Sequence, residues 1–126
     1  MLRQPLAIAL FLALPGVATA QSDEPPQEWR CISANHTLAV SVMPSDARPA
    51  LFTLDEKVQS DAKLTRRNGN IRLFAAATAD KLFLALHLRA DGSSEILHQP
   101  MGGESVLEPA TCEGRAGLIA YLESRL

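Results

Sequence analysis

The two cysteines constrain the fold most strongly, because Cys31 lies near the start of the chain and Cys112 near its end. They follow a segment typical of export, and in an oxidising compartment two cysteines with no third predict one disulfide. Closing a loop of this length stabilises a folded chain by about 4.5 kcal/mol before native strain is subtracted. With no Cys-x-x-Cys motif, the pair predicts a structural staple rather than a redox site. The fold must therefore bring these two positions together.

Export is predicted by residues 1–20, which read as a signal peptide. Arg3 precedes an apolar run from Leu6 to Leu14, and the small residues Ala18-Thr19-Ala20 form a cleavage site. The run is too short to span a bilayer, which takes about 20 apolar residues. Cleavage would leave Gln21 first, which offers no thiol for a lipid anchor. We expect a mature form without a transmembrane segment, periplasmic in a Gram-negative bacterium and secreted otherwise.

Charge and length limit the classes of partner. The formal charge of −2 becomes −3 once Arg3 is removed with the signal peptide, since residues 1–20 hold no acid. A weakly acidic chain gives no electrostatic reason to expect nucleic-acid binding. Residues 21–28 are polar and contain two prolines, which predicts a flexible lead. Residues 29–126 then have the length of a single domain.

Alternation of apolar and polar residues predicts strands through most of that domain. The expected strands include 36–43, 50–54, 82–89, 95–99 and 104–110. In 82–89 the four leucines occupy every second position, which predicts that they face inward. The segment 55–63 fits either a helix or a strand, because Leu54, Val58 and Ala62 have helical spacing while Val58, Ala62 and Leu64 share a strand face.

Asn68-Gly69 is the strongest turn signal in the chain, since both residues tolerate the positive φ of a type I′ turn. It predicts a hairpin between 63–67 and 70–74. In that register Leu64 lies opposite Leu73, Arg66 opposite Ile71, and Thr65 opposite Arg72 on the other face.

The end of the chain predicts an amphipathic helix over 115–126, with Leu118, Ile119, Leu122 and Leu126 at helical spacing. The predicted fold is mainly β, a small antiparallel barrel-like or sandwich sheet of about seven strands with this helix and one disulfide. Trp29, beside Cys31, is expected to be a core residue packed on the bridge.

The His87/His98 pair is the one constellation in the sequence that suggests a metal site. If the turn after Leu88 has an even number of residues, His87 and His98 fall on one face of neighbouring strands. His36 or a nearby carboxylate would be needed to complete such a site, or Met43 or Met101 if the metal were copper. The alternative is an ordinary pair of solvated side chains on the outer face of the sheet, and we expect no cofactor.

Arg66, Arg67 and Arg72 surround the predicted hairpin turn. Such a basic cluster can dock on an acidic partner. The pattern is more typical of a solvated hairpin tip that keeps the sheet edge soluble. No catalytic motif with a nucleophile, metal or nucleotide signature is present, so the sequence predicts no catalytic residue and a non-enzymatic protein.

The layout resembles the small periplasmic and membrane-bound inhibitors of c-type lysozyme. An aromatic-x-Cys first strand at Trp29-Arg30-Cys31, a series of short strands and a terminal Cys112, all behind a signal peptide, carry the likeness. The resemblance implies a small β domain that inhibits a lytic enzyme. Those inhibitors use a Ser-Gly-x-x-Tyr segment, whereas this chain has no Ser-Gly dipeptide and its only tyrosine, Tyr121, lies in the expected helix. No functional residue is therefore carried across.

These features predict an exported domain that binds another envelope or extracellular protein through a sheet edge or hairpin tips. The alternatives are an inhibitor of a lytic enzyme such as c-type lysozyme and a periplasmic metal-binding protein. An inhibitor would need a protruding loop, for which the candidates are the Asn68-Gly69 hairpin and Met101-Gly102-Gly103.

Overall fold

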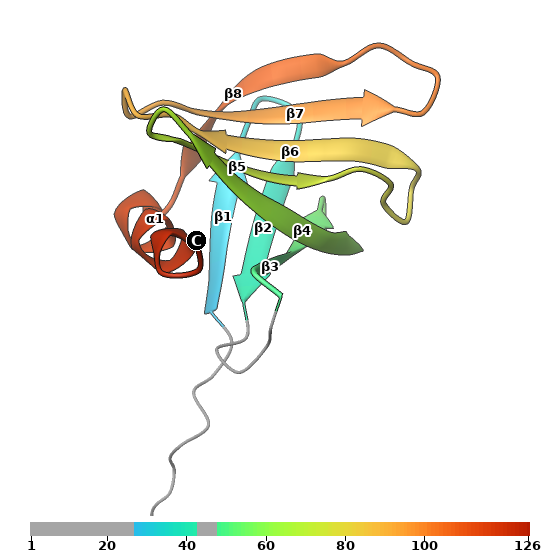
Figure 1. The fold of residues 1–126 in the computed structure, drawn as a ribbon. Coiled ribbons are helices and arrows are strands. Elements are labelled where there is room, and N and C mark those ends of the chain that lie inside the picture. Colours follow the sequence, from blue (N-terminus) through green and yellow to red (C-terminus); the bar gives the residue numbers. More distant parts are fainter. Residues whose placement is uncertain (1–26, 43–47) are drawn as a thin grey trace, which may run out of the picture.

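The computed structural model describes residues 27–42 and 48–126, which form a closed antiparallel barrel with one C-terminal helix (Figure 1). The chain runs up and down, each strand pairing with the next. The strands are β1 (Gln27–Ile32), β2 (Thr37–Val42), β3 (Ala50–Leu54), β4 (Lys57–Arg67), β5 (Asn70–Ala75), β6 (Leu82–Leu88), β7 (Ser94–Pro100) and β8 (Val106–Cys112), followed by α1 (Arg115–Glu123). The mainly β prediction is confirmed, as a barrel of eight strands rather than about seven.

The first and last strands close the barrel through a narrow seam. Cys31 pairs with Cys112 and Ile32 with Thr111, and the predicted disulfide joins the two cysteines. Beyond it, the N–H of Glu113 donates to the carbonyl of Arg30 at 2.9 Å. A closed barrel has no open sheet edge, so this seam completes the architecture.

Some sequence predictions concern residues outside the described ranges, and two predicted boundaries differ from those of the structure. The predicted signal peptide, most of the lead 21–28 and Met43 lie outside the described residues. The end of the lead does not stay flexible, because Gln27 and Glu28 pair with β2 as the start of β1. The predicted helix 115–126 ends three residues early, at Glu123, and Leu126 is exposed.

The barrel interior is filled by apolar side chains from alternate strand positions. Leu84 and Leu86 of β6 have no exposed area, and Leu82 and Leu88 are also buried, which confirms that this face points inward. The largest fully buried side chains are Phe52, Leu38, Leu73, Leu84, Leu86, Leu88, Ile96, Leu118, Leu122, Val40, Val42 and Cys31. The interior is therefore a packed core.

The ambiguous segment 55–63 is strand from Lys57 onward, after a turn in which Asp55 and Glu56 have positive φ values of 50° and 71°. The register shifts in this hairpin, since Phe52 pairs with Ser60 and Thr53 with Val58. This β-bulge changes the facing of the side chains before it. Val58 is consequently 57% exposed, so the expectation that it shares a face with buried Ala62 was wrong.

The hairpin around Asn68-Gly69 forms in the predicted register. Leu64 pairs with Leu73, Arg66 with Ile71 and Thr65 with Arg72. The φ values are 54° at Asn68 and 79° at Gly69, as a type I′ turn requires. The Asn68-Gly69 turn thus correctly predicted which side chains of β4 and β5 lie opposite one another.

Helix α1 packs on the barrel through buried Leu118 and Leu122. The indole of Trp29 contacts the helix, with its ring centroid 5.8 Å from that of Tyr121. Gly114 lies so close that a Cβ there would be 3.3 Å from the indole, and its φ of 65° also favours glycine. Trp29 is thus partly buried against α1 as well as the core cluster.

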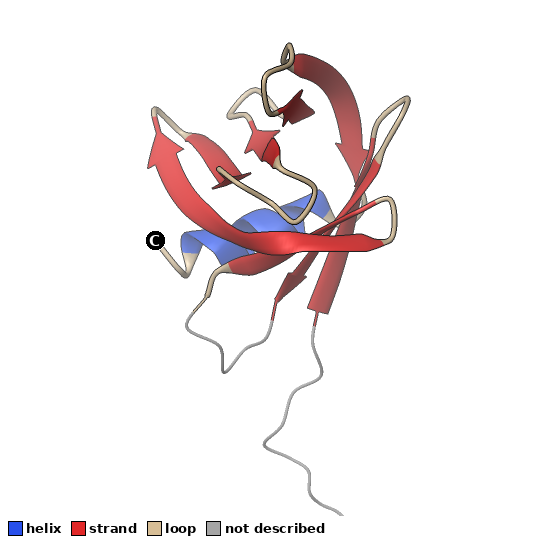
Figure 2. Cartoon of the chain, turned by 90° about the vertical axis from the view of Figure 1, so that its right-hand side faces the viewer, coloured by secondary structure: helices blue, strands red, loops and turns tan. Residues whose placement is uncertain are grey.

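Helix α1 lies against one end of the barrel, called the helix end here (Figure 2), and polar contacts hold it there. The Arg115 guanidinium donates to Ser94 Oγ at 2.8 Å and to the carbonyls of Arg89 at 2.8 Å and Ser93 at 3.0 Å. At the other end of the helix, Glu123 lies 3.6 Å from Arg66 of β4. The helix therefore contacts both the β6–β7 turn and the end of β4.

Replacing Leu84 by Ala should lower the free energy of unfolding by about 2–5 kcal/mol, because a fully buried leucine leaves a cavity. The matched control is Leu107→Ala, the same change at a side chain that is 47% exposed, which should cost about 0.5 kcal/mol or less. Urea denaturation of both variants checks this. Equal costs would show that β6 does not present its leucines to a packed interior.

Candidate functional site

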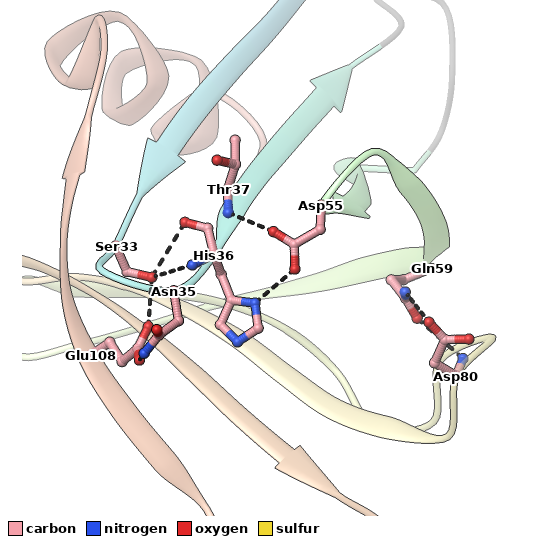
Figure 3. A network of polar contacts seen from close by, with 8 residues as sticks. All are labelled: Ser33, Asn35, His36, Thr37, Asp55, Gln59, Asp80 and Glu108. Atoms are coloured by element: carbon pink, nitrogen blue, oxygen red, sulfur yellow. Dashed lines mark hydrogen bonds and ion pairs between the residues drawn. The ribbon is translucent and has the colours of Figure 1, made fainter.

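Polar side chains gather at both ends of the barrel. At one end they hydrogen-bond to one another, whereas at the other some arginines have no acid partner among the described residues. The end opposite α1, called the loop end here, is formed by the turns β1–β2, β3–β4, β5–β6 and β7–β8. Its network of contacts is drawn in Figure 3. A basic groove lies at the helix end, on the outer face of β4, β5 and β6.

His36 lies at the centre of the loop end. Its ring nitrogen Nδ1 is 2.8 Å from Asp55 Oδ2, and the N–H of Thr37 donates to Asp55 Oδ1 at 2.9 Å. The His36 ring also stacks on that of His98, with centroids 4.8 Å apart. Partial burial raises the pKa of Asp55, but the contacts with Thr37 and His36 outweigh burial and the net pKa is lowered. Asp55 therefore holds the turn with positive φ against β2.

Glu108 of β8 holds the β1–β2 loop at the same end. Ser33 Oγ donates to its carboxylate at 2.6 Å, and Asn35 Nδ2 donates to the other oxygen. These hydrogen bonds, that from Ser33 first, lower the pKa of Glu108. Both carboxylate oxygens are used within the chain.

The bulge residue Gln59 holds a third loop. Its side chain is buried, donates to Asp80 Oδ2 at 2.8 Å and accepts from the Asp80 N–H at 3.2 Å. Lys57 also forms an ion pair with Asp80. The side-chain hydrogen bonds from Lys57 and then from Gln59 lower the pKa of Asp80. The bulge thus directs the Gln59 side chain toward the β5–β6 loop, where it hydrogen-bonds to Asp80.

The structure does not place His87 and His98 on the same face of the sheet. Leu88 pairs with Ser94, which leaves an odd loop of five residues, 89–93, so the condition for a shared face is not met. His87 lies opposite Glu95, and His98 lies opposite buried Leu84 and stacks on His36 instead. Within the described ranges, no group of three or more His, Cys, Asp or Glu residues is placed to hold a metal ion.

The basic groove differs from the loop end because part of its charge is not compensated. We call it the arginine groove; its volume is about 490 Å³. It is lined by Thr65, Arg66, Arg67, Asn68, Asn70, Ile71, Arg72, His87 and Arg89. All three arginines predicted as a cluster therefore lie in it.

The arginines of the groove have different partners. Arg66 lies 3.6 Å from Glu123, and Arg89 lies 2.6 Å from Glu95. Arg67 and Arg72 form no ion pair with any side chain in 27–42 or 48–126. The groove therefore carries two positive charges without a carboxylate partner in the described chain.

Arg72 is held in place by aromatic rings rather than by an acid. Its guanidinium carbon lies 5.0 Å from the ring centroid of Phe74 and 5.3 Å from that of Phe83. Its Nε is buried and has no acceptor among the described residues. A stacked guanidinium whose charge has no acid partner is suited to a planar anion such as a carboxylate.

His87 and Arg89 belong to the groove but were not predicted as part of it. His87 pairs with Arg72 across the strands, and Glu95 follows on the next strand. Burial lowers the pKa of His87, and the positive charges of Arg72 and Arg89 lower it further against the opposing effect of Glu95. Alternation in β6 could place His87 and Arg89 on the outer face, but their position beside Arg72 depends on the pairing of β5 with β6.

Comparisons with protein-family models, with curated proteins and with solved structures found no significant match. Among the helices of the described chain, none has the length and apolar character needed to cross a membrane.

Lowering the pH should weaken the loop end. The pKa values of Asp55, Asp80 and Glu108 are lowered in the folded chain, so the unfolded chain binds more protons in acid. Their stabilising contribution is present above the unfolded values near 4 and is lost as the pH falls through the folded values. We expect Glu108→Gln to reduce the loss of unfolding free energy between about pH 5 and pH 3.

Urea denaturation at each pH measures this effect. The matched control is Glu104→Gln, the same change at an exposed residue of the β7–β8 loop, which should keep the wild-type profile. If the Glu108→Gln profile also matched that of the wild type, the hydrogen bonds from Ser33 and Asn35 would not lower the pKa of the Glu108 carboxylate.

Proposed function

We propose that this chain is an exported, non-enzymatic domain that binds another envelope or extracellular protein through the arginine groove. The observation that carries the proposal is the pair of arginines, Arg67 and Arg72, without a carboxylate partner in the described chain. Arg72 is also oriented on two aromatic rings, which holds its guanidinium in place. An acidic group of a partner would supply the carboxylate that both arginines lack in the described chain.

The contrast with the loop end supports this choice. There, Asp55, Asp80 and Glu108 each hydrogen-bond to neighbouring residues of the same chain, which accounts for their positions as structural contacts. In the groove, by contrast, Arg67 and Arg72 have no carboxylate partner among the described residues, although Arg66 and Arg89 do. Complementary charge also gives a protein interface its orientation and raises its association rate.

Export remains part of the proposal. The signal peptide predicted over 1–20 would direct the chain to the periplasm or the exterior, and the Cys31–Cys112 disulfide is compatible with an oxidising compartment. Inhibition of a c-type lysozyme, which the sequence resemblance implies, is one class of partner within this proposal. Its direct test is a lysozyme activity assay with the purified protein.

Capture of partners from an envelope extract by the immobilised protein tests the groove. Arg67→Glu reverses a charge on an exposed side chain, so it should leave folding intact and lower capture several-fold. Capture should also fall as salt rises from about 50 to about 300 mM, because exposed charges are screened.

The matched control is Arg30→Glu, the same reversal at an exposed arginine on β1, outside the groove. It should leave capture unchanged. Equal capture by wild type and Arg67→Glu, or capture indifferent to salt, would remove the groove as the docking surface. Enzymatic turnover of an ester, peptide or glycan would overturn the non-enzymatic assignment.

A further inference from the structure

We propose that the arginine groove seats a carboxylate of its protein partner on the row formed by Thr65, Arg72 and His87, and that this binding takes up one proton at His87. The inference rests on the proposed function and goes further, because it names the chemical group recognised and the regulation of its binding by pH.

The row comes from the register of three neighbouring strands. Thr65 of β4 pairs with Arg72 of β5, and Arg72 pairs with His87 of β6. Side chains directly opposite each other have Cβ atoms about 4.5–5.5 Å apart, so Arg72 has Thr65 on one side and His87 on the other as near neighbours. A hydroxyl, a guanidinium and an imidazole therefore line one site on the outer face.

Arg72 supplies the main attraction in this row. Its stacking on Phe74 and Phe83 fixes the plane of the guanidinium, so less side-chain freedom remains to be lost on binding. Its Nε is closed to solvent, so a carboxylate would accept from the two terminal nitrogens of the guanidinium at once. Arg67 adds a second positive charge at the edge of the same groove.

His87 supplies the response to pH. The charged groups around it are Arg72 on β5, Arg89 after β6, and Glu95 on β7, whose Oε1 lies 3.7 Å from the His87 Nδ1. Burial and the two arginines hold the pKa of His87 below its usual range, so the ring is neutral near pH 7. A bound carboxylate opposes the field of the arginines and favours the protonated ring.

The sign of the effect follows from linkage. Because the complex binds more protons at His87 than the free protein does, affinity rises as the pH falls toward the pKa of the ring. One proton can change affinity by at most about tenfold for each pH unit. Glutamate side chains stay ionised in this window, since their usual pKa is about 4.3, so the ligand itself does not cancel the effect.

The test is a titration of the protein with acetylated and amidated tetraglutamate, followed by NMR of the Arg72 Nε–H and the His87 ring. Tetraglutamine is the neutral control peptide. Tetraglutamate should shift both signals and bind several-fold more tightly at pH 5.8 than at pH 7.5, and the pKa of His87 should rise in its complex. Equal binding of the two peptides would overturn the carboxylate site.

Three variants separate the roles. Arg72→Gln should abolish the shift of the His87 ring, and His87→Gln should still shift the Arg72 Nε–H signal with tetraglutamate but bind with the same affinity at both pH values. Arg30→Gln, which removes a positive charge outside the groove, should behave as wild type. Retained binding in Arg72→Gln, or a pH dependence that persists in His87→Gln, would overturn the assignment.

Inorganic phosphate serves as a second probe. Phosphate that binds the row as tightly as tetraglutamate would overturn carboxylate selectivity in favour of a general anion site. Failure of this inference is distinguishable from failure of the proposed function. If Arg67→Glu lowers capture from the extract while affinity for tetraglutamate does not change with pH, the groove remains the docking surface and the proton linkage alone is wrong.

Discussion

The seam between β1 and β8 is the contact on which the barrel depends. Two residue pairs and one disulfide join these strands, whereas β6 and β7 pair from Leu82–Pro100 to Leu88–Ser94. The covalent bond at Cys31–Cys112 fixes the position where the ladder is shortest. From there the chain enters α1 through Gly114, and the helix lies against Trp29 of β1. The bridge therefore positions both the closing strand and the helix that covers the end of the barrel.

Closure of the barrel leads to two unlike ends. At the loop end, Asp55, Asp80 and Glu108 hold the turns together, and their lowered pKa values follow from hydrogen bonds within the chain. At the helix end, the outer face of β4 to β6 collects positive charge that the described chain only partly neutralises, with Arg72 unpaired. Polar groups that satisfy one another stabilise a fold, whereas an oriented and unpaired charge is available to a partner. This difference is the basis for placing function in the arginine groove.

Sequence patterns predicted what depends on local chemistry. The Asn68-Gly69 turn predicted the register of β4 and β5, and alternation predicted the buried face of β6. The bulge that turns Val58 outward could not be predicted, because alternation assumes an unbroken period of two. The stacking of His98 on His36 depends on how the β1–β2 loop folds over the barrel, which no local sequence pattern predicts. The arginine cluster was predicted on one hairpin, and its extension to His87 needed the pairing of a third strand.

Amide hydrogen exchange, measured on the oxidised protein and after reduction of the disulfide, tests most directly whether the bridge acts at the seam. The Glu113 N–H, which donates to Arg30, and the amides of α1 lie next to the bridge in the chain. If the bridge closes the barrel, reduction should speed exchange most strongly at Glu113 and in α1, while β5, β6 and β7 keep most of their protection. An equal increase in all strands would contradict this account, because the bridge would then act only by restricting the unfolded chain.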